Sequence, residues 1–341
     1  MDEQTFLNDE TTATNQPGLE NKIGYADVSI IMDFALGIKT ELQKVIIGMD
    51  DTIEMLVVGL LTNGHILLEG VPGIAKTLLV KLLANVMDVE YKRIQFTPDL
   101  MPSDVVGTTV YNMQSSNFYF RKGPVFSNII LADEINRAPA KTQAALFEVM
   151  EERQITVDGE THPMKYPLFI IATQNPIEQE GTFRLPEAQL DRFLFRLKMG
   201  YPKIEEENLI LSRFKSDFFN KTEHNVNKIF NADDLLRCTS VVEQVYIKDE
   251  MLNYISQIVC NTRDNSNLFL GASPRASLGI MRTSKALAAI RGRDFVTPDD
   301  IQKVAYPVLN HRIILTPERE IEGIDASDII HDIIQKIDVP R

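Results

Sequence analysis

The sequence is short of cysteine, of positive charge and of long apolar runs, and each shortage excludes a class of protein. Its two cysteines, Cys238 and Cys260, show no C-x-x-C spacing, so neither a disulfide framework nor a zinc site is indicated. Lys and Arg number 35 against 48 Asp and Glu, a formal net charge of −13, which argues against tight non-specific binding to nucleic acid or to an anionic membrane. No apolar run approaches the length of a membrane span, and residues 1–21 lack the basic and apolar regions of a signal peptide, so we expect a cytoplasmic protein without membrane contact.

A chain of 341 residues suits about two domains. We expect a polar tail over residues 1–24, a mixed α/β core over residues 25–200 and a helical domain over residues 201–341. In the core, short buried runs that suit strands alternate with stretches of helical periodicity. Beyond residue 200 strands become rare, and the cap residues Asn231 and Thr297 each precede an expected helix.

A glycine-rich loop lies between an expected strand at residues 65–69 and an expected helix at residues 78–87. Such a loop suits phosphate, because its N–H groups and the helix N-terminus converge on phosphate oxygens. Lys76 would add a charge at the β- and γ-phosphates, and the Thr77 hydroxyl would bind Mg²⁺. Ala75 departs from the usual glycine, which is tolerated if the backbone there is helical but not if φ is positive; an ordinary glycine-rich turn is the alternative interpretation. We expect a nucleotide to contact this loop, the residue after it and the helix break near residue 47, namely Ile47, Gly48, Gly70, Val71, Pro72, Gly73, Ile74, Ala75, Lys76, Thr77 and Leu78.

Two further expected strands end in polar side chains. The run at residues 128–132 leads into Asp133 and Glu134, and the run at residues 168–173 is followed by Asn175. Acids at the carboxyl end of a buried parallel strand stand where α/β sheets bind ligands. Asp133 would hold the Mg²⁺ bound to Thr77, Glu134 would polarise the attacking water, and Asn175 would orient that water or contact the γ-phosphate. The alternatives are a strand that ends in solvated acids and a turn-forming Asn before proline.

Two segments outside these strands are expected to form hairpins. Residues 99–122 are punctuated by proline, glycine and asparagine and carry aromatic residues near their end, which favours turns and a small hairpin. Residues 154–166 contain an Asp-Gly turn between two strand-like runs. His162, beside that turn, is expected to be an exposed surface histidine.

Five features follow one another along the chain: the loop at residues 70–77, the acids at 133–134, Asn175, Arg192 and Arg275. Their order resembles the Walker A, Walker B, sensor 1, arginine finger and sensor 2 elements of AAA+ ATPases. More narrowly, nearly the whole chain beyond its first residues resembles the MoxR family, in which alanine at the position of Ala75 is common. The runs that carry this resemblance lie at residues 70–77, 132–138, 150–154, 172–176, 190–193 and 271–276.

The resemblance implies a fold, a reaction and an assembly. The fold would be an AAA+ P-loop core, an αβα sandwich with a mainly parallel sheet, followed by a helical lid, and both hairpins would project toward the pore of a ring. The ring, expected to be a homo-hexamer, would hydrolyse Mg-ATP between subunits, with Arg192 of one subunit against the γ-phosphate of its neighbour. Arg184 is a rival for that role, and either arginine could instead be a surface residue paired with Asp191 or Glu187. Arg275 is a cation at a helix start and needs a nearby anion, which a nucleotide bound by the same or the neighbouring subunit would supply.

Several kinds of motor share these features. The resemblance implies a chaperone-like ATPase that remodels, matures or activates client proteins, with von Willebrand factor A domain proteins as partners. A metal-chelatase motor subunit is an alternative. A nucleic-acid motor is disfavoured by the net charge of −13 and by the few basic residues on the hairpins. A nucleotide-binding scaffold without turnover is disfavoured because Glu134 and Arg192 are both present.

Overall fold

A five-stranded sheet lies at the centre of the computed structural model, which describes residues 26–176, 181–215 and 226–340. The strand order is β2-β5-β8-β1-β9, and all neighbouring strands are parallel. The expected tail at residues 1–24 lies outside the described residues. The strands are β1 (Ile66–Gly70), β2 (Tyr91–Gln95), β5 (Ile129–Asp133), β8 (Phe169–Gln174) and β9 (Phe195–Met199).

The two faces of the sheet pack into two hydrophobic cores, because successive side chains of a strand point to opposite faces. In β1, Ile66 and Leu68 pack with one set of helices, whereas Leu67 packs with the other. The α/β sandwich predicted from the sequence is therefore confirmed. The first set is α1 (Ser29–Gln43), α2 (Asp50–Leu61) and α3 (Lys76–Val86), and the second is α4 (Pro102–Val106) and α5 (Ala140–Glu152).

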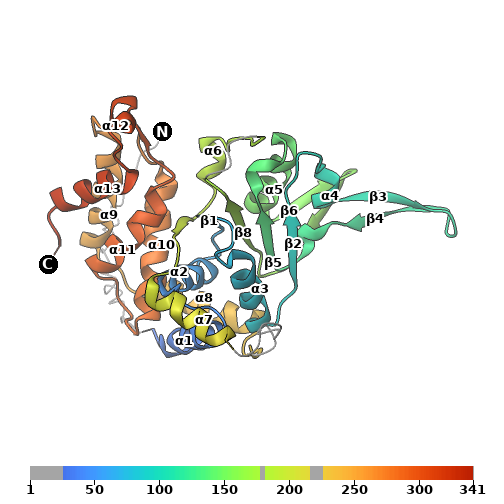
Figure 1. Ribbon diagram of the computed structural model, residues 1–341, viewed down its shortest axis with the longest axis horizontal. Coiled ribbons are helices and arrows are strands. Elements are labelled where there is room, and N and C mark those ends of the chain that lie inside the picture. The colour runs from blue at the N-terminus through green and yellow to red at the C-terminus, as the bar shows by residue number, and fades with distance from the viewer. Residues whose placement is uncertain (1–25, 177–180, 216–225, 341) are drawn as a thin grey trace, which may run out of the picture.

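After β9 the chain is mainly helical, as expected, and none of the described helices is long and apolar enough to cross a bilayer. The predicted caps are present: the Asn231 side chain accepts from the first turn of its helix, and Thr297 forms a capping box with Asp300. Helices α1 and α2 contact α8 and α10, so the hydrophobic core runs from the sheet into this helical region (Figure 1). The elements are α7 (Ile204–Phe214), α8 (Ala232–Gln244), α9 (Asp249–Arg263), β10 (Leu268–Leu270), α10 (Pro274–Ile290), α11 (Pro298–Leu309), β11 (Ile314–Leu315), α12 (Pro317–Ile321) and α13 (Ala326–Lys336).

Both expected hairpins are present and lie side by side. Strands β3 (Gly107–Asn112) and β4 (Asn117–Lys122) form an arm that extends from the body of the molecule (Figure 1). Beside its base lies the pair of β6 (Gln154–Val157) and β7 (Glu160–Pro163). The expectation of an exposed His162 is wrong, because its half-buried ring stacks on Phe120 of the first hairpin with 4.4 Å between ring centroids.

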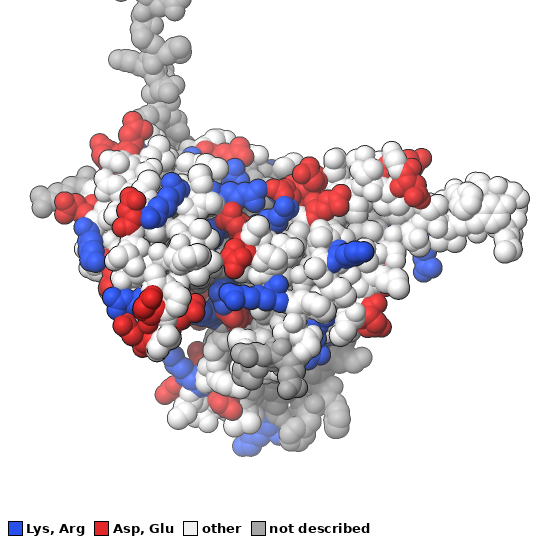
Figure 2. Space-filling model, turned by 90° about the horizontal axis from the view of Figure 1, so that it is seen from above, with Lys and Arg blue, Asp and Glu red and all other residues white. Residues whose placement is uncertain are grey.

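The far end of the β3–β4 arm is uncharged and carries exposed hydrophobic side chains among polar ones. Met113 is 87% exposed and Phe118 is 71% exposed. Figure 2 shows that this end carries no charged side chain on the face in view. The arm therefore presents an uncharged tip with exposed hydrophobic side chains rather than the basic surface that a nucleic-acid contact would need.

Candidate functional site

Three neighbouring strands end together at the carboxyl edge of the sheet. Strand β8 lies between β5 and β1. Asp133 ends β5, the buried Asn175 directly follows β8, and the glycine-rich loop follows β1. The fold thus brings the predicted loop, the two predicted acids and the predicted amide to one edge.

The loop after β1 has the backbone shape of a cradle. Gly70 is enclosed, since a Cβ there would lie 2.8 Å from the Met199 carbonyl oxygen. Gly73 has φ +85°, and a Cβ there would meet nothing within 4 Å, so the loop is open on this side. Helix α3 begins at Lys76, and the N–H groups of its first turn have no partner within the helix. A phosphate group fits this arrangement of open backbone and positive helix end.

Ala75 has φ +58° and ψ +22°, in the left-handed region. The positive φ that makes alanine unfavourable at this position of the loop is therefore present. This conformation costs a non-glycine residue about 1–2 kcal/mol. We expect Ala75→Gly to raise the free energy of unfolding by about 0.5–1 kcal/mol. This is the strain that glycine relieves, less the conformational entropy that glycine loses on folding. Urea unfolding measures the change. Ala144→Gly, at an exposed position within α5, is the matched control and should lower the free energy of unfolding by about 1 kcal/mol. A lower free energy of unfolding in both variants would contradict the assignment of strain to Ala75.

Lys76 and the acids lie within electrostatic reach of one another. The Lys76 ammonium group donates to the Gly70 carbonyl oxygen at 2.5 Å. Burial lowers the pKa of Lys76, and the carboxylates of Asp133, Glu134 and Glu69 partly oppose that shift. Thr77 follows Lys76 on the first turn of α3, and its binding of Mg²⁺ stays a prediction.

Asp133 is held by side chains from both neighbouring strands. Its Oδ2 accepts from Nη2 of Arg93 on β2 at 2.6 Å, and its Oδ1 accepts from Oγ1 of Thr173 on β8 at 2.5 Å. We did not predict either partner from the sequence. A predicted strand order would have indicated both partners, because β2 and β8 flank β5 and present side chains to its end.

Glu134 occupies a left-handed turn with φ +56° and ψ +48°. Its backbone N–H donates to Thr173 Oγ1 at 2.9 Å, and its Oε2 accepts from Gln95 Nε2 at 2.8 Å. The same oxygen lies 3.3 Å from Nε of Arg137, in the short helix η2 (Ile135–Arg137). The turn and these partners fix the carboxylate at the edge of the sheet. Gln95 was also missed, although it lies two residues after Arg93 and so faces the same side of β2.

Ile47 and Gly48 lie in the turn between α1 and α2. Gly48 has φ +70°, and a Cβ there would lie 2.3 Å from Cδ of Glu206 on α7. The first helix after the sheet therefore covers this turn. A contact between the turn and a nucleotide base stays a prediction.

Arg192 and Arg275 lie at the opposite edge of the sheet. Arg192 precedes β9, and it lines a cavity of about 310 Å³ together with Arg275 and with His65, the residue before β1. Strand β1 has 5 residues, and a strand of that length spans about 16 Å. The cavity and the glycine-rich loop are thus separated by the length of the strands, so these arginines cannot reach a phosphate held by their own chain.

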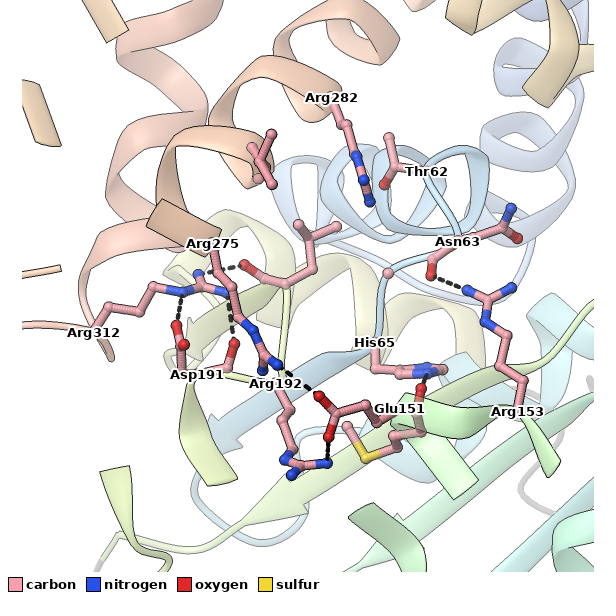
Figure 3. Close-up of a pocket in the computed structure, with 15 residues that line it drawn as sticks. Thr62, Asn63, His65, Glu151, Arg153, Asp191, Arg192, Arg275, Arg282 and Arg312 are labelled. Carbon is pink, nitrogen blue, oxygen red and sulfur yellow. Dashed lines mark hydrogen bonds and ion pairs between the residues drawn. The ribbon is translucent and has the colours of Figure 1, made fainter. Parts of the chain in front are cut away.

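This cavity is strongly basic (Figure 3). The Glu151 carboxylate forms ion pairs with both Arg192 and Arg275, the latter at 2.6 Å. The expected partners of Arg192, Asp191 or Glu187, are therefore wrong. Asp191 instead accepts from Nε of Arg312 at 2.7 Å. Besides these two carboxylates, the lining includes the arginines Arg153, Arg192, Arg275, Arg282 and Arg312.

The structure places the two candidate arginine fingers, Arg184 and Arg192, in different surroundings. The residue before Arg184, Phe183, donates its N–H to the Asn136 carbonyl oxygen at 2.6 Å, which places this segment beside the end of β5. Arg184 is exposed, and it forms no hydrogen bond or ion pair within the described ranges. Of the two, only Arg192 lines the basic cavity. The short helix α6 (Glu187–Leu190) lies between them in the chain.

Comparison with known proteins adds three findings. Residues 65–195 match the model of the ATPase family associated with various cellular activities (AAA), and residues 260–333 match the AAA lid domain. The chain is 44% identical to chaperone MoxR1 of Mycobacterium tuberculosis, over 88% of this chain and 81% of that protein, and 45% identical to the uncharacterized protein YeaC of Bacillus subtilis, over 88% and 92%. A crystallised protein from Cytophaga hutchinsonii is similar with a TM-score of 0.85 and 44% identity, over 95% of this chain and 100% of that one.

Proposed function

Because this chain belongs to the MoxR family of AAA+ ATPases, we propose that it hydrolyses Mg-ATP at the subunit interfaces of a homo-oligomeric ring and thereby remodels client proteins. One observation carries the proposal. The loop and acids lie at the carboxyl edge of the sheet, and the paired arginines lie at the amino edge. A complete site then needs the carboxyl edge of one subunit and the amino edge of another, and a repeated contact of this kind forms a ring when the rotation between subunits closes.

The residues at the carboxyl edge fit a nucleotide with its metal ion. The loop at residues 70–77 would bind the phosphates through backbone N–H groups and Lys76. Thr77 and Asp133 would hold Mg²⁺, a small ion that commonly takes one or two protein oxygens together with phosphate oxygens. When bound there, Mg²⁺ neutralises the charge that develops on the phosphates. Arg93 would then have to share or release the Asp133 carboxylate.

The hydrolytic step is assigned to three residues of this chain. Glu134 would take a proton from the attacking water, and Asn175, buried between the loop and the acids, would orient that water. Arg192 of the neighbouring subunit would stabilise the charge on the transferred group. Arg275 of the same neighbour would contribute a second cation, since it lies with Arg192 rather than with its own loop.

The family supports the proposal of client remodelling. MoxR1 is named a chaperone, which supports a protein client over a metal-chelatase or nucleic-acid motor. The uncharged tip of the β3–β4 arm, with its exposed Met113 and Phe118, agrees with a protein client. A hexameric ring and partners with von Willebrand factor A domains are parts of the same proposal.

Measuring ATP turnover against protein concentration, with the mass of the particles determined in the same buffer, tests the proposal. We expect turnover per subunit to rise steeply where the mass shows assembly, because the isolated subunit lacks the arginines of its site. Turnover that is independent of assembly would contradict the shared site. A fully assembled protein without turnover would contradict the proposed hydrolysis.

A further inference from the structure

Two charges in the basic cavity are placed where helix dipoles disfavour them. Glu151 lies in the last turn of α5, near the negative end of that helix, and Arg275 is the second residue of α10, at its positive end. Each of these two placements is explained by the other residue, because Nη2 of Arg275 lies 2.6 Å from Oε1 of Glu151. The anion that Arg275 requires is therefore supplied within the subunit.

The same carboxylate also holds Arg192. One oxygen of Glu151 pairs with Arg192 and the other with Arg275. Arg192 additionally donates to the Phe147 carbonyl oxygen, one helical turn before Glu151, at 3.1 Å. The C-terminal part of α5 thus binds Arg192 through the Phe147 carbonyl oxygen and the Glu151 carboxylate.

The end of α5 is fixed to the sheet. Nε2 of the buried His65 is 3.2 Å from the Met150 carbonyl oxygen, and its Nδ1 accepts from the Ile170 N–H at 3.1 Å. Burial lowers the pKa of His65 to about 4, so the ring stays neutral near pH 7 and keeps both contacts. Glu151 therefore extends from a rigid support.

From this geometry we propose that Glu151 is a positioning residue that ties Arg275 of the lid to Arg192 of the core, so that both guanidinium groups meet the phosphate of the neighbouring subunit as one unit. The inference rests on the proposed function. A guanidinium group has five N–H donors, and Arg275 uses only one of its terminal nitrogens on Glu151, so donors remain for a phosphate. Without the carboxylate the two adjacent cations would repel each other and separate.

A second contact keeps the lid attached when Glu151 is altered. Asp191, next to Arg192 in the chain, accepts from Arg312 and from the Ser273 hydroxyl, which precedes α10. This link does not involve Glu151. Loss of the Glu151 carboxylate should therefore disturb the placement of the two arginines while the fold and the lid contact persist.

Comparing Glu151→Gln with Glu152→Gln tests the proposal. Glu152 is the adjacent residue, is also exposed, and makes no hydrogen bond or ion pair within the part of the chain that the structure describes. We expect Glu151→Gln to lower kcat by about 10- to 100-fold, the effect of a small misplacement of a catalytic group. The Kd for ATP of the isolated subunit should not change, because that subunit's own loop is intact. Glu152→Gln should match the wild type in both quantities.

Amide hydrogen exchange of isolated subunits gives a readout that needs no hydrolysis. In Glu151→Gln the start of α10 and the segment between α6 and β9 should exchange several-fold faster than in Glu152→Gln. Equal kcat in the two variants, or equal exchange, would overturn the role of Glu151. A wild type without turnover would instead contradict the proposed function, and the exchange result would then decide the role of Glu151 alone.

Discussion

Glu134→Gln is expected to bind ATP as the wild type does and to hydrolyse it at least about 100-fold more slowly, the contribution of a positioned general base. Glutamine has the shape of glutamate, so its side-chain oxygen can still accept from Gln95, as Glu134 does at 2.8 Å. What the substitution removes is the carboxylate that would accept the proton of the attacking water. Turnover at saturating ATP and a nucleotide titration of the same preparation separate the two effects.

One control variant makes the Glu134 result specific. Glu152→Gln removes the same charge at an exposed site at the end of α5 and should leave turnover unchanged. Normal turnover in Glu134→Gln would remove Glu134 from its assigned role. Loss of ATP binding would point to a structural role instead, since the left-handed turn and the bond from the Glu134 N–H to Thr173 help to shape this edge.

The sheet and its carboxyl edge were predictable from the sequence because local patterns determine them. Continuous apolar runs marked the three central strands, and the residues after them mark the same edge in any parallel sheet. The hairpins were predictable for a similar reason, since their turns have local signals: an Asp-Gly pair in residues 154–166, and proline, glycine and asparagine in residues 99–122. Each of these inferences used residues that are close together in the chain.

The partners of the site residues could not be predicted, because they depend on how distant segments pack. Glu151 and Arg275 are separated by 124 positions, and Arg93 and Asp133 by 40. The prediction for His162 was wrong for the same reason, since its stacking partner Phe120 belongs to another hairpin. The left-handed backbone of Ala75 could not be predicted either, because alanine disfavours this conformation and only the folded loop imposes it.

Arg192→Ala is expected to bind ATP normally and to lose about 10³- to 10⁵-fold in turnover, the range known for arginine fingers in nucleotide hydrolases. Arg192 lies across the sheet from its own loop, in the cavity that it shares with Arg275. The loss therefore falls on the site of the neighbouring subunit. Arg184→Ala is the control and should retain normal turnover. The opposite result in the two variants would transfer the finger role to Arg184.

Mixed rings decide whether Arg192 acts between subunits. Lys76→Ala removes the lysine proposed to bind phosphate but keeps Arg192, so each variant alone should be inactive. In an equal mixture of the two, about one quarter of the interfaces would join an intact loop to an intact arginine if subunits combine at random in a head-to-tail ring. Turnover should return toward that fraction, because each such interface is complete. A mixture that stays inactive although the subunits co-assemble would contradict a shared site, since an arginine that serves its own loop cannot be replaced by one from a neighbour.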